Sequence, residues 1–200
     1  RWTLDRPPEW LCLPDAERGC AQLPGTLVER LDAAVERLGI NTVLVVTEPQ
    51  SHPCYLRWAI PRGLRILVEK PLYAPPLASI CPAAARRVTE VYAEIDELLR
   101  RHPRAHVTVM AQRRYHPAYE WVINELRSVV REFGIPLSLI AYHYSDGQFV
   151  LPDELDYADH PFSQGFGKAL HGGYHGVDLL AQLLQVNQLL PEKCPTKLGV

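Results

Sequence analysis

The sequence predicts an α/β protein in which parallel strands alternate with helices. Two short apolar segments rich in β-branched residues, Thr42–Val46 and Arg65–Val68, flank a stretch with helical character. Such segments are typical of strands covered on both faces, and two strands joined by a crossover helix form a parallel βαβ unit. A third segment, Val107–Met110, follows a long amphipathic stretch, Pro82–Arg101. Together the three segments predict one parallel sheet.

A helix is predicted before the first strand. Residues 1–25 contain several prolines and no sustained period, so we interpret them as irregular. Thr26 is placed to open the helix, Glu29 to complete a capping box, and Gly39 to end it. The buried side of this helix is formed by apolar residues at helical spacing, namely Leu27, Leu31, Val35 and Leu38.

Polar side chains are predicted to gather where the first two strands end. Ser51 is placed to cap the helix between the strands, and Pro53 falls in its first turn, where a missing N–H is tolerated. Pro71 ends the second strand, because proline has no N–H to donate. Ligands bind at the carboxyl ends of parallel strands. The residues expected there are Thr47, Glu48, Pro49 and His52 after the first strand, and Glu69 and Lys70 after the second.

The second half of the chain predicts two helices and a strand. Pro117 begins a helix, residues 136–144 read as the first strand of a second sheet, and a further helix is entered through Gly172 and Gly173. Between them lies an acidic loop, residues 146–168, whose spacing matches no calcium-binding loop. We therefore predict no metal there.

The last predicted helix carries two histidines and a carboxylate. His171 and His175 are four residues apart and Asp178 follows three later, so all three can share one helix face. A histidine oriented by a carboxylate suits proton transfer near neutral pH. Two histidines at this spacing also suit zinc, although Gly172 stands where a zinc hydrolase would have its glutamate. Histidines that only cap and pack the helix are the third possibility.

The segments TEPQSH and ILVEKPL, in their strand–loop–helix–strand setting, resemble the Gfo/Idh/MocA family of glucose–fructose and inositol oxidoreductases. The resemblance covers roughly residues 26–185. It implies a partial Rossmann-type parallel sheet, the remainder of a dinucleotide-binding domain in residues 1–112. The start of an α+β substrate domain follows in residues 113–200. It also implies NAD or NADP as cofactor, hydride transfer to or from a sugar, cyclitol or related carbonyl compound, and a homo-oligomeric full-length protein.

The resemblance also implies roles for the residues already named. Lys70 and His175 are the expected catalytic residues: Lys70 polarises the substrate oxygen and His175 transfers its proton. Glu69 is expected to position Lys70, and Asp178 to hold His175, while His171 stands where many members have aspartate. Cofactor-binding residues are expected at Thr47, Pro49, His52, Glu69, Lys70, Gln112 and Arg113, whereas Arg114 is expected to be solvated.

A feature of dinucleotide-binding domains is missing from these 200 residues. They contain no G-x-G-x-x-G, the turn that brings pyrophosphate to a helix N-terminus. We therefore expect a fragment of a longer protein, with a divergent chain that lost its phosphate loop as the alternative. Two other function classes stay open: a relative that binds dinucleotide or sugar without turnover, and a metal-dependent hydrolase that uses His171 and His175.

Composition argues against several partners. A net charge of −2 gives no reason to expect nucleic acid or an anionic membrane. No apolar run is long enough to span a bilayer, and the start of the sequence has no signal-peptide pattern. The five cysteines are scattered without a Cys-x-x-Cys, which suggests reduced thiols in a cytoplasmic protein. They are Cys12, Cys20, Cys54, Cys81 and Cys194.

Overall fold

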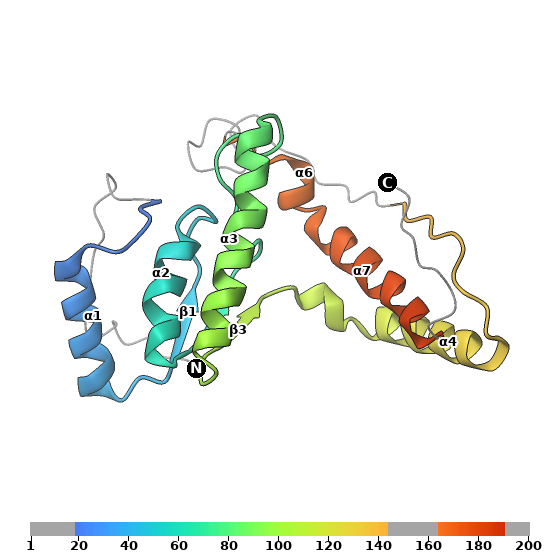
Figure 1. Cartoon of the computed structure of the whole chain (residues 1–200), viewed down its shortest axis with the longest axis horizontal. Coiled ribbons are helices and arrows are strands. Elements are labelled where there is room, and N and C mark those ends of the chain that lie inside the picture. The colour runs from blue at the N-terminus through green and yellow to red at the C-terminus, as the bar shows by residue number, and fades with distance from the viewer. Residues whose placement is uncertain (1–18, 144–163, 191–200) are drawn as a thin grey trace, which may run out of the picture. The chain divides into compact units, whose positions relative to one another are not determined.

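The computed structural model of the protein describes residues 19–143 and 164–190 (Figure 1). The chain separates into two units, Arg1–Met110 and Ala111–Val200. The first unit is α/β, as predicted, and its sheet is parallel throughout. Its elements are α1 (Gly25–Leu38), β1 (Thr42–Val45), α2 (His52–Ala59), the 3₁₀ turn η2 (Ile60–Arg62), β2 (Arg65–Val68), α3 (Pro82–Arg101) and β3 (His106–Val109).

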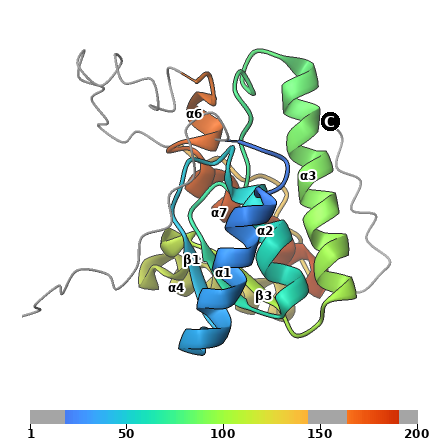
Figure 2. The same ribbon diagram turned by 90° about the vertical axis from the view of Figure 1, so that its left-hand side faces the viewer.

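The sheet has the order β1-β2-β3, with Val45 beside Val68 and Val68 beside Val109. Helix α2 lies between α1 and α3 in both ribbon views (Figures 1 and 2). One hydrophobic core holds side chains from all three helices and from one face of the sheet. Its most buried members include Leu56 of α2, Ile66 and Val68 of β2, and Val91 and Ile95 of α3.

The opposite face of the sheet is open. Leu44 of β1 is 60% exposed and Leu67 of β2 is 39% exposed. The prediction that the strands are covered on both faces is therefore wrong within the part of the chain that the structure describes. The physical reason is that side chains alternate along a strand, while α1, α2 and α3 all pack into the core on one face.

Gly39 ends α1 as predicted, but the side-chain caps predicted at the N-termini of α1 and α2 are wrong. Helix α1 begins at Gly25, because the N–H groups of Leu27 and Val28 donate to the carbonyl of Pro24 at 3.0 and 2.9 Å. No side chain caps it, so the capping box proposed for Thr26 does not form. Ser51 does not cap α2 either; its Oγ accepts a hydrogen bond from the N–H of Gly19 at 3.3 Å.

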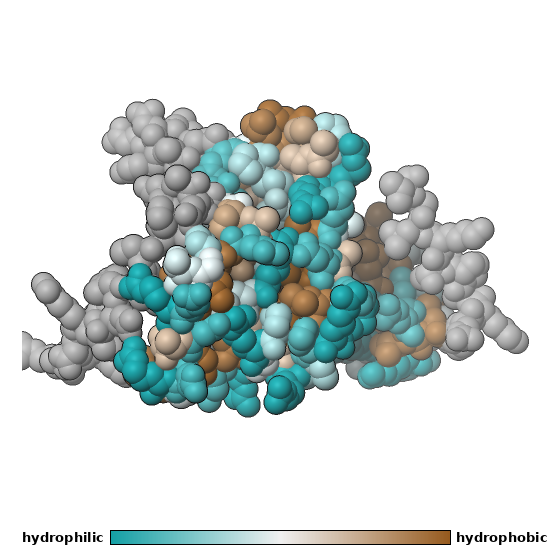
Figure 3. All heavy atoms as spheres, turned by 60° about the vertical axis from the view of Figure 1, so that its left-hand side comes forward, coloured by the Kyte–Doolittle hydropathy of each residue, from teal (hydrophilic) through white to brown (hydrophobic). Residues whose placement is uncertain are grey.

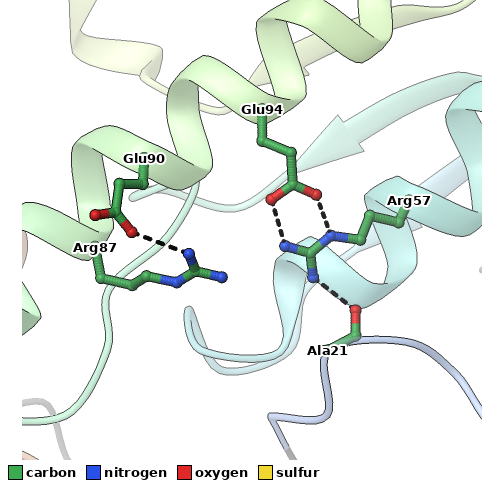
Figure 4. Close-up of polar contacts among 5 residues, drawn as sticks. All are labelled: Ala21, Arg57, Arg87, Glu90 and Glu94. Carbon is green, nitrogen blue, oxygen red and sulfur yellow. Dashed lines mark hydrogen bonds and ion pairs between the residues drawn. The ribbon is translucent and has the colours of Figure 1, made fainter.

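Two arginines tie the helices of the first unit together. Arg57 of α2 donates from Nε and Nη2 to the Glu94 carboxylate of α3 at 2.5 and 2.8 Å, and from Nη1 to the carbonyl of Ala21 at 2.6 Å (Figure 4). Arg62 donates to the Asp32 carboxylate of α1 from Nε and from Nη2, and Nη2 lies 2.6 Å from Oδ2. Such bidentate pairs fix geometry as well as adding energy.

The described part of the second unit is helical. Its elements are η3 (Gln112–Tyr115), α4 (Pro117–Phe133), α6 (Gly167–Leu170), α7 (Tyr174–Gln185) and η4 (Val186–Leu189). Its core is small, with Ile123, Val130, Leu179 and Val186 at the centre.

The strand predicted for residues 136–144 is wrong over its described part, residues 136–143, which carry no strand. The backbone of Leu137 pairs with a side chain instead. Its N–H donates to Asn187 Oδ1 at 2.8 Å, and its carbonyl accepts from Asn187 Nδ2 at 3.0 Å. The amide of Asn187 thus satisfies the two backbone groups that a neighbouring strand would otherwise have paired.

Two positions near the start of α7, Gly173 and Gly176, have no room for a side chain. A Cβ on Gly173 would lie 2.8 Å from the carbonyl oxygen of Lys168, and one on Gly176 would lie 2.8 Å from Cε1 of Tyr142. The chain therefore turns from α6 into α7 against its own backbone, and the Tyr142 ring packs directly on α7. Any larger side chain at either position would force one of these neighbours to move.

On the face shown in Figure 3 most side chains are polar, and an apolar cluster stands at the top, the end at which α3 begins in Figure 1. Leu77 and Ile80, in the loop before α3, are 49% and 75% exposed. None of the described helices combines the length and the apolar character that a membrane span needs.

Candidate active site

The first unit places two predicted groups of site residues at one edge of its sheet. Strand β1 ends at Val45 and β2 at Val68, and the pairing extends one residue further because Glu69 N–H donates to the Val45 carbonyl at 2.8 Å. Just beyond, Thr47 is exposed and Pro49 half-buried, and Glu69 and Lys70 are half-buried. The Lys70–Pro71 peptide bond is cis. The carboxyl ends of β1 and β2 thus carry a threonine, two carboxylates and an amine within a short span.

His52 lies beneath this edge rather than on it. Its ring is 0% exposed and contacts three backbone carbonyls: Nε2 is 2.9 Å from Thr47, and Nδ1 is 3.1 Å from Pro71 and 3.3 Å from Leu72. Burial lowers the pKa of His52 below its ordinary 6.5, although these carbonyls and the Glu69 carboxylate act in the opposite direction. The sequence marked His52 as lining a ligand, but the ring itself offers no exposed surface.

In the second unit, α7 begins at Tyr174, so His175 and Asp178 lie on it and His171 does not. His171 ends the short helix α6, with φ −94° and ψ −94°. The prediction that His171, His175 and Asp178 share one helix face is therefore wrong for His171. The tight turn at Gly173 separates the two helices where the sequence suggested one.

Asp178 is held by hydrogen bonds from two side chains. Its carboxylate accepts from Arg114 Nε at 3.0 and 3.2 Å, from the Nη2 of the same side chain, and from Gln182 Nε2 at 3.0 Å. The Asp178 side chain is 12% exposed, and this carboxylate raises the pKa of Arg114. The expectation that Arg114 is solvated is therefore wrong, because its guanidinium is ion-paired with Asp178. That Asp178 orients His175 stays a prediction.

Gln112 and Arg113 precede Arg114 in η3, and both are exposed. A cofactor contact by either residue stays a prediction. No local pattern indicates the Arg114–Asp178 pair, because its members are 64 residues apart.

The described residues form no candidate metal centre. Within residues 19–143 and 164–190, no group of three or more histidine, cysteine, aspartate or glutamate side chains is placed to hold a metal ion. His171 and His175 therefore gain no third ligand from the described residues. Most of the acidic loop, residues 146–163, lies outside the described residues.

Comparisons with known proteins bear on the fold. No family model and no curated protein matches this chain. Two crystal structures of the WlbA (WbpB) dehydrogenase from Thermus thermophilus are similar to it. The complex with NAD and alpha-ketoglutarate has 20% identity over 80% of this chain, with a TM-score of 0.55. The complex with NAD and UDP-GlcNAcA has 22% identity over 81%, with a TM-score of 0.54.

This likeness shows that the chain shares the Rossmann-type α/β fold of those structures. The chain spans 46% of the length of those proteins, a little under half.

Proposed function

We propose that this chain belongs to an NAD(P)-dependent oxidoreductase of the Gfo/Idh/MocA type, acting on a sugar, cyclitol or related carbonyl compound. The observation that carries the proposal is the pair of neighbouring strand ends. Parallel strands β1 and β2 finish side by side, with Thr47 and Pro49 after one and Glu69 and Lys70 after the other. In parallel sheets this is the edge at which ligands bind. The likeness to dehydrogenases solved with NAD supports the same reading.

The residues at this edge fit the nicotinamide end of a dinucleotide. Thr47 offers a hydroxyl and Lys70 an ammonium group, both reachable from solvent, and Pro49 adds apolar surface. Gln112 and Arg113 add donors for the same cofactor in the proposal. Dinucleotide-binding domains hold the pyrophosphate at a G-x-G-x-x-G turn, and these 200 residues contain no G-x-G-x-x-G. The cofactor-binding role proposed for this chain is therefore the nicotinamide half.

The chemistry assigns separate tasks to Lys70 and His175. The cofactor, when bound, accepts or supplies the hydride. In the oxidation direction, His175 takes the proton of the substrate hydroxyl as the carbon that bears this hydroxyl loses its hydride. In the reduction direction, His175 returns the proton to the oxygen. Lys70 stabilises negative charge on the same oxygen, with Glu69 beside it as its positioning partner. The proposal requires both side chains to reach one substrate oxygen.

The test uses the natural, full-length protein, with nicotinamide absorbance following turnover of a panel of sugars and sugar nucleotides. His175→Ala is expected to lower turnover by a factor of about 10²–10⁴ while the Kd for the cofactor changes little. Lys70→Ala is expected to lower turnover and also to weaken substrate binding, because its charge acts in both the ground and transition states.

Two further variants sharpen the assignment. His106→Asn is the matched histidine control, because His106 begins β3 at the amino end of the sheet and should leave turnover unchanged. His171→Asn keeps hydrogen-bonding capacity but cannot titrate, so a modest loss marks His171 as a binding residue. If His171→Asn abolishes turnover and His175→Ala spares it, the acid–base role belongs to His171. Cofactor binding without turnover of any substrate would instead indicate the non-catalytic relative.

A further inference from the structure

His52 lies between the two loops that carry the proposed cofactor and substrate residues. Its Nε2 contacts the carbonyl of Thr47 at 2.9 Å, in the loop after β1. Its Nδ1 contacts the carbonyls of Pro71 at 3.1 Å and Leu72 at 3.3 Å, directly after Lys70. With the ring fully buried, the first residue of α2 thus joins the two loops from inside the unit.

The number of protons on the ring decides how the loops are held. A backbone carbonyl only accepts hydrogen bonds, so each contact requires an N–H on the ring. The neutral ring has one N–H and donates to one loop only, which leaves its bare nitrogen facing a carbonyl oxygen of the other loop, whereas the imidazolium donates to both. Glu69 favours the charged form and burial opposes it. In either form the ring has a different nitrogen for each loop.

We propose that His52 is a positioning residue that sets the spacing between the Thr47 loop and the Lys70–Leu72 turn. The proposal rests on the proposed function, in which Thr47 and Pro49 contact the dinucleotide and Lys70 contacts the substrate oxygen. His52 touches neither ligand and acts only through the two loops. Because a misplacement of about 1 Å can cost about 10²-fold in rate, this spacing matters to catalysis.

The two nitrogens can be separated by substitution. The amide nitrogen of asparagine can take the place of Nδ1, so His52→Asn keeps the tie to Pro71 and Leu72 and loses the tie to Thr47. The longer glutamine places its amide near Nε2, so His52→Gln keeps the tie to Thr47 and loses the other. Cofactor Kd and kcat are measured for both variants in the natural, full-length protein.

We expect one variant to change mainly the cofactor Kd and the other to change mainly kcat. His52→Asn should weaken cofactor binding about 10-fold, the equivalent of one hydrogen bond, while kcat stays within about 3-fold of wild type. His52→Gln should leave the cofactor Kd within about 3-fold and lower kcat by about 10–100-fold. A parallel loss of both quantities in both variants, in step with the melting temperature, would overturn the positioning role. Unchanged Kd and kcat in both variants would do the same.

Amide hydrogen exchange tests the tie without any activity. Ser51 N–H, bonded to the Glu48 carbonyl at 2.8 Å, reports on the first loop, and Glu69 N–H reports on the second. His52→Leu should speed exchange at both amides and leave the centre of α3 unchanged. Ser51→Ala, which removes a neighbouring buried hydroxyl that contacts only Gly19 in the described hydrogen bonds, is the control.

The exchange data keep two kinds of failure apart. If the wild-type protein neither binds nor uses a nicotinamide cofactor, the proposed function fails, and exchange alone decides whether His52 joins the loops. Unchanged exchange in His52→Leu would show that the loops hold their positions without the ring and would overturn the inference, whatever the activity.

Discussion

Glu94→Gln provides a quantitative test of how α2, α3 and the N-terminal segment are held together. The substitution keeps the shape of the side chain but replaces one acceptor oxygen with an amide that cannot accept from Arg57. Of the two bonds between them, one is lost, and the other keeps the charge of Arg57 but loses that of the carboxylate. A hydrogen bond to a charged group contributes about 1.5–3 kcal/mol and a neutral one about 1 kcal/mol.

Solvent screening reduces this figure, because the Glu94 side chain is 42% exposed while that of Arg57 is 18% exposed. We therefore expect the free energy of unfolding to fall by about 1 kcal/mol. In a chain of this size that is a decrease of about 2–4 °C in Tm by calorimetry. The bond from Arg57 also lowers the pKa of the Glu94 carboxyl below its ordinary 4.5. The difference in unfolding free energy between wild type and Glu94→Gln should therefore vanish as the pH falls below 4.5 and the Glu94 carboxyl becomes protonated.

Glu90→Gln is the matched control, one turn earlier in the same helix (Figure 4). Glu90 makes a single 3.0 Å bond to Arg87, and both side chains are more than half exposed, at 59% and 51%. Exposed pairs of this kind contribute little to stability, so no resolvable change is expected. Equal losses in the two variants, or a loss in Glu90→Gln alone, would refute the argument that burial and bidentate geometry decide the contribution.

Three further outcomes are expected. Alkylation at neutral pH should modify Cys81 faster than Cys54, because backbone N–H groups of α3 lower the pKa of Cys81 while burial raises that of Cys54 to about 12; peptide mass spectrometry gives the order. The stability gap between wild type and His52→Asn should narrow as the pH falls below 6.5 in urea titrations, because a histidine whose pKa is lowered on folding loses its contribution in acid. Gly176→Ala should lower the free energy of unfolding by about 1–2 kcal/mol, since the clash with Tyr142 outweighs the better helix propensity of alanine; chemical denaturation measures it.

The parts of the fold that the sequence predicted are those specified by local pattern. The apolar segment Arg65–Val68 became β2, and the amphipathic stretch Pro82–Arg101 became α3, as predicted. The polar residues after each strand also reached the expected edge, because a parallel register fixes where neighbouring strands end. Such elements can be predicted because their periodicity depends only on residues that are close together in the sequence.

The failures depend on partners far away in the chain. Residues 136–143 look like a strand by composition, yet Asn187 satisfies the backbone of Leu137 from 50 residues away. Arg114 reads as a solvated surface residue until Asp178 is placed beside it. The contacts of the buried His52 ring could not be predicted either, because a histidine that contacts backbone carbonyls has no characteristic sequence pattern. Single-sequence reasoning cannot rank such long-range contacts.

In the proposed mechanism, the carboxyl ends of β1 and β2 hold the nicotinamide beside Lys70, and His175 transfers the substrate proton. A crystal structure of the natural, full-length protein with NAD(H) and a bound sugar tests it most directly. We predict that the nicotinamide ring lies against Thr47 and Lys70, with Lys70 Nζ and a His175 nitrogen each about 2.6–3.2 Å from one substrate oxygen. A cofactor bound elsewhere, or a substrate oxygen that neither side chain reaches, would contradict it.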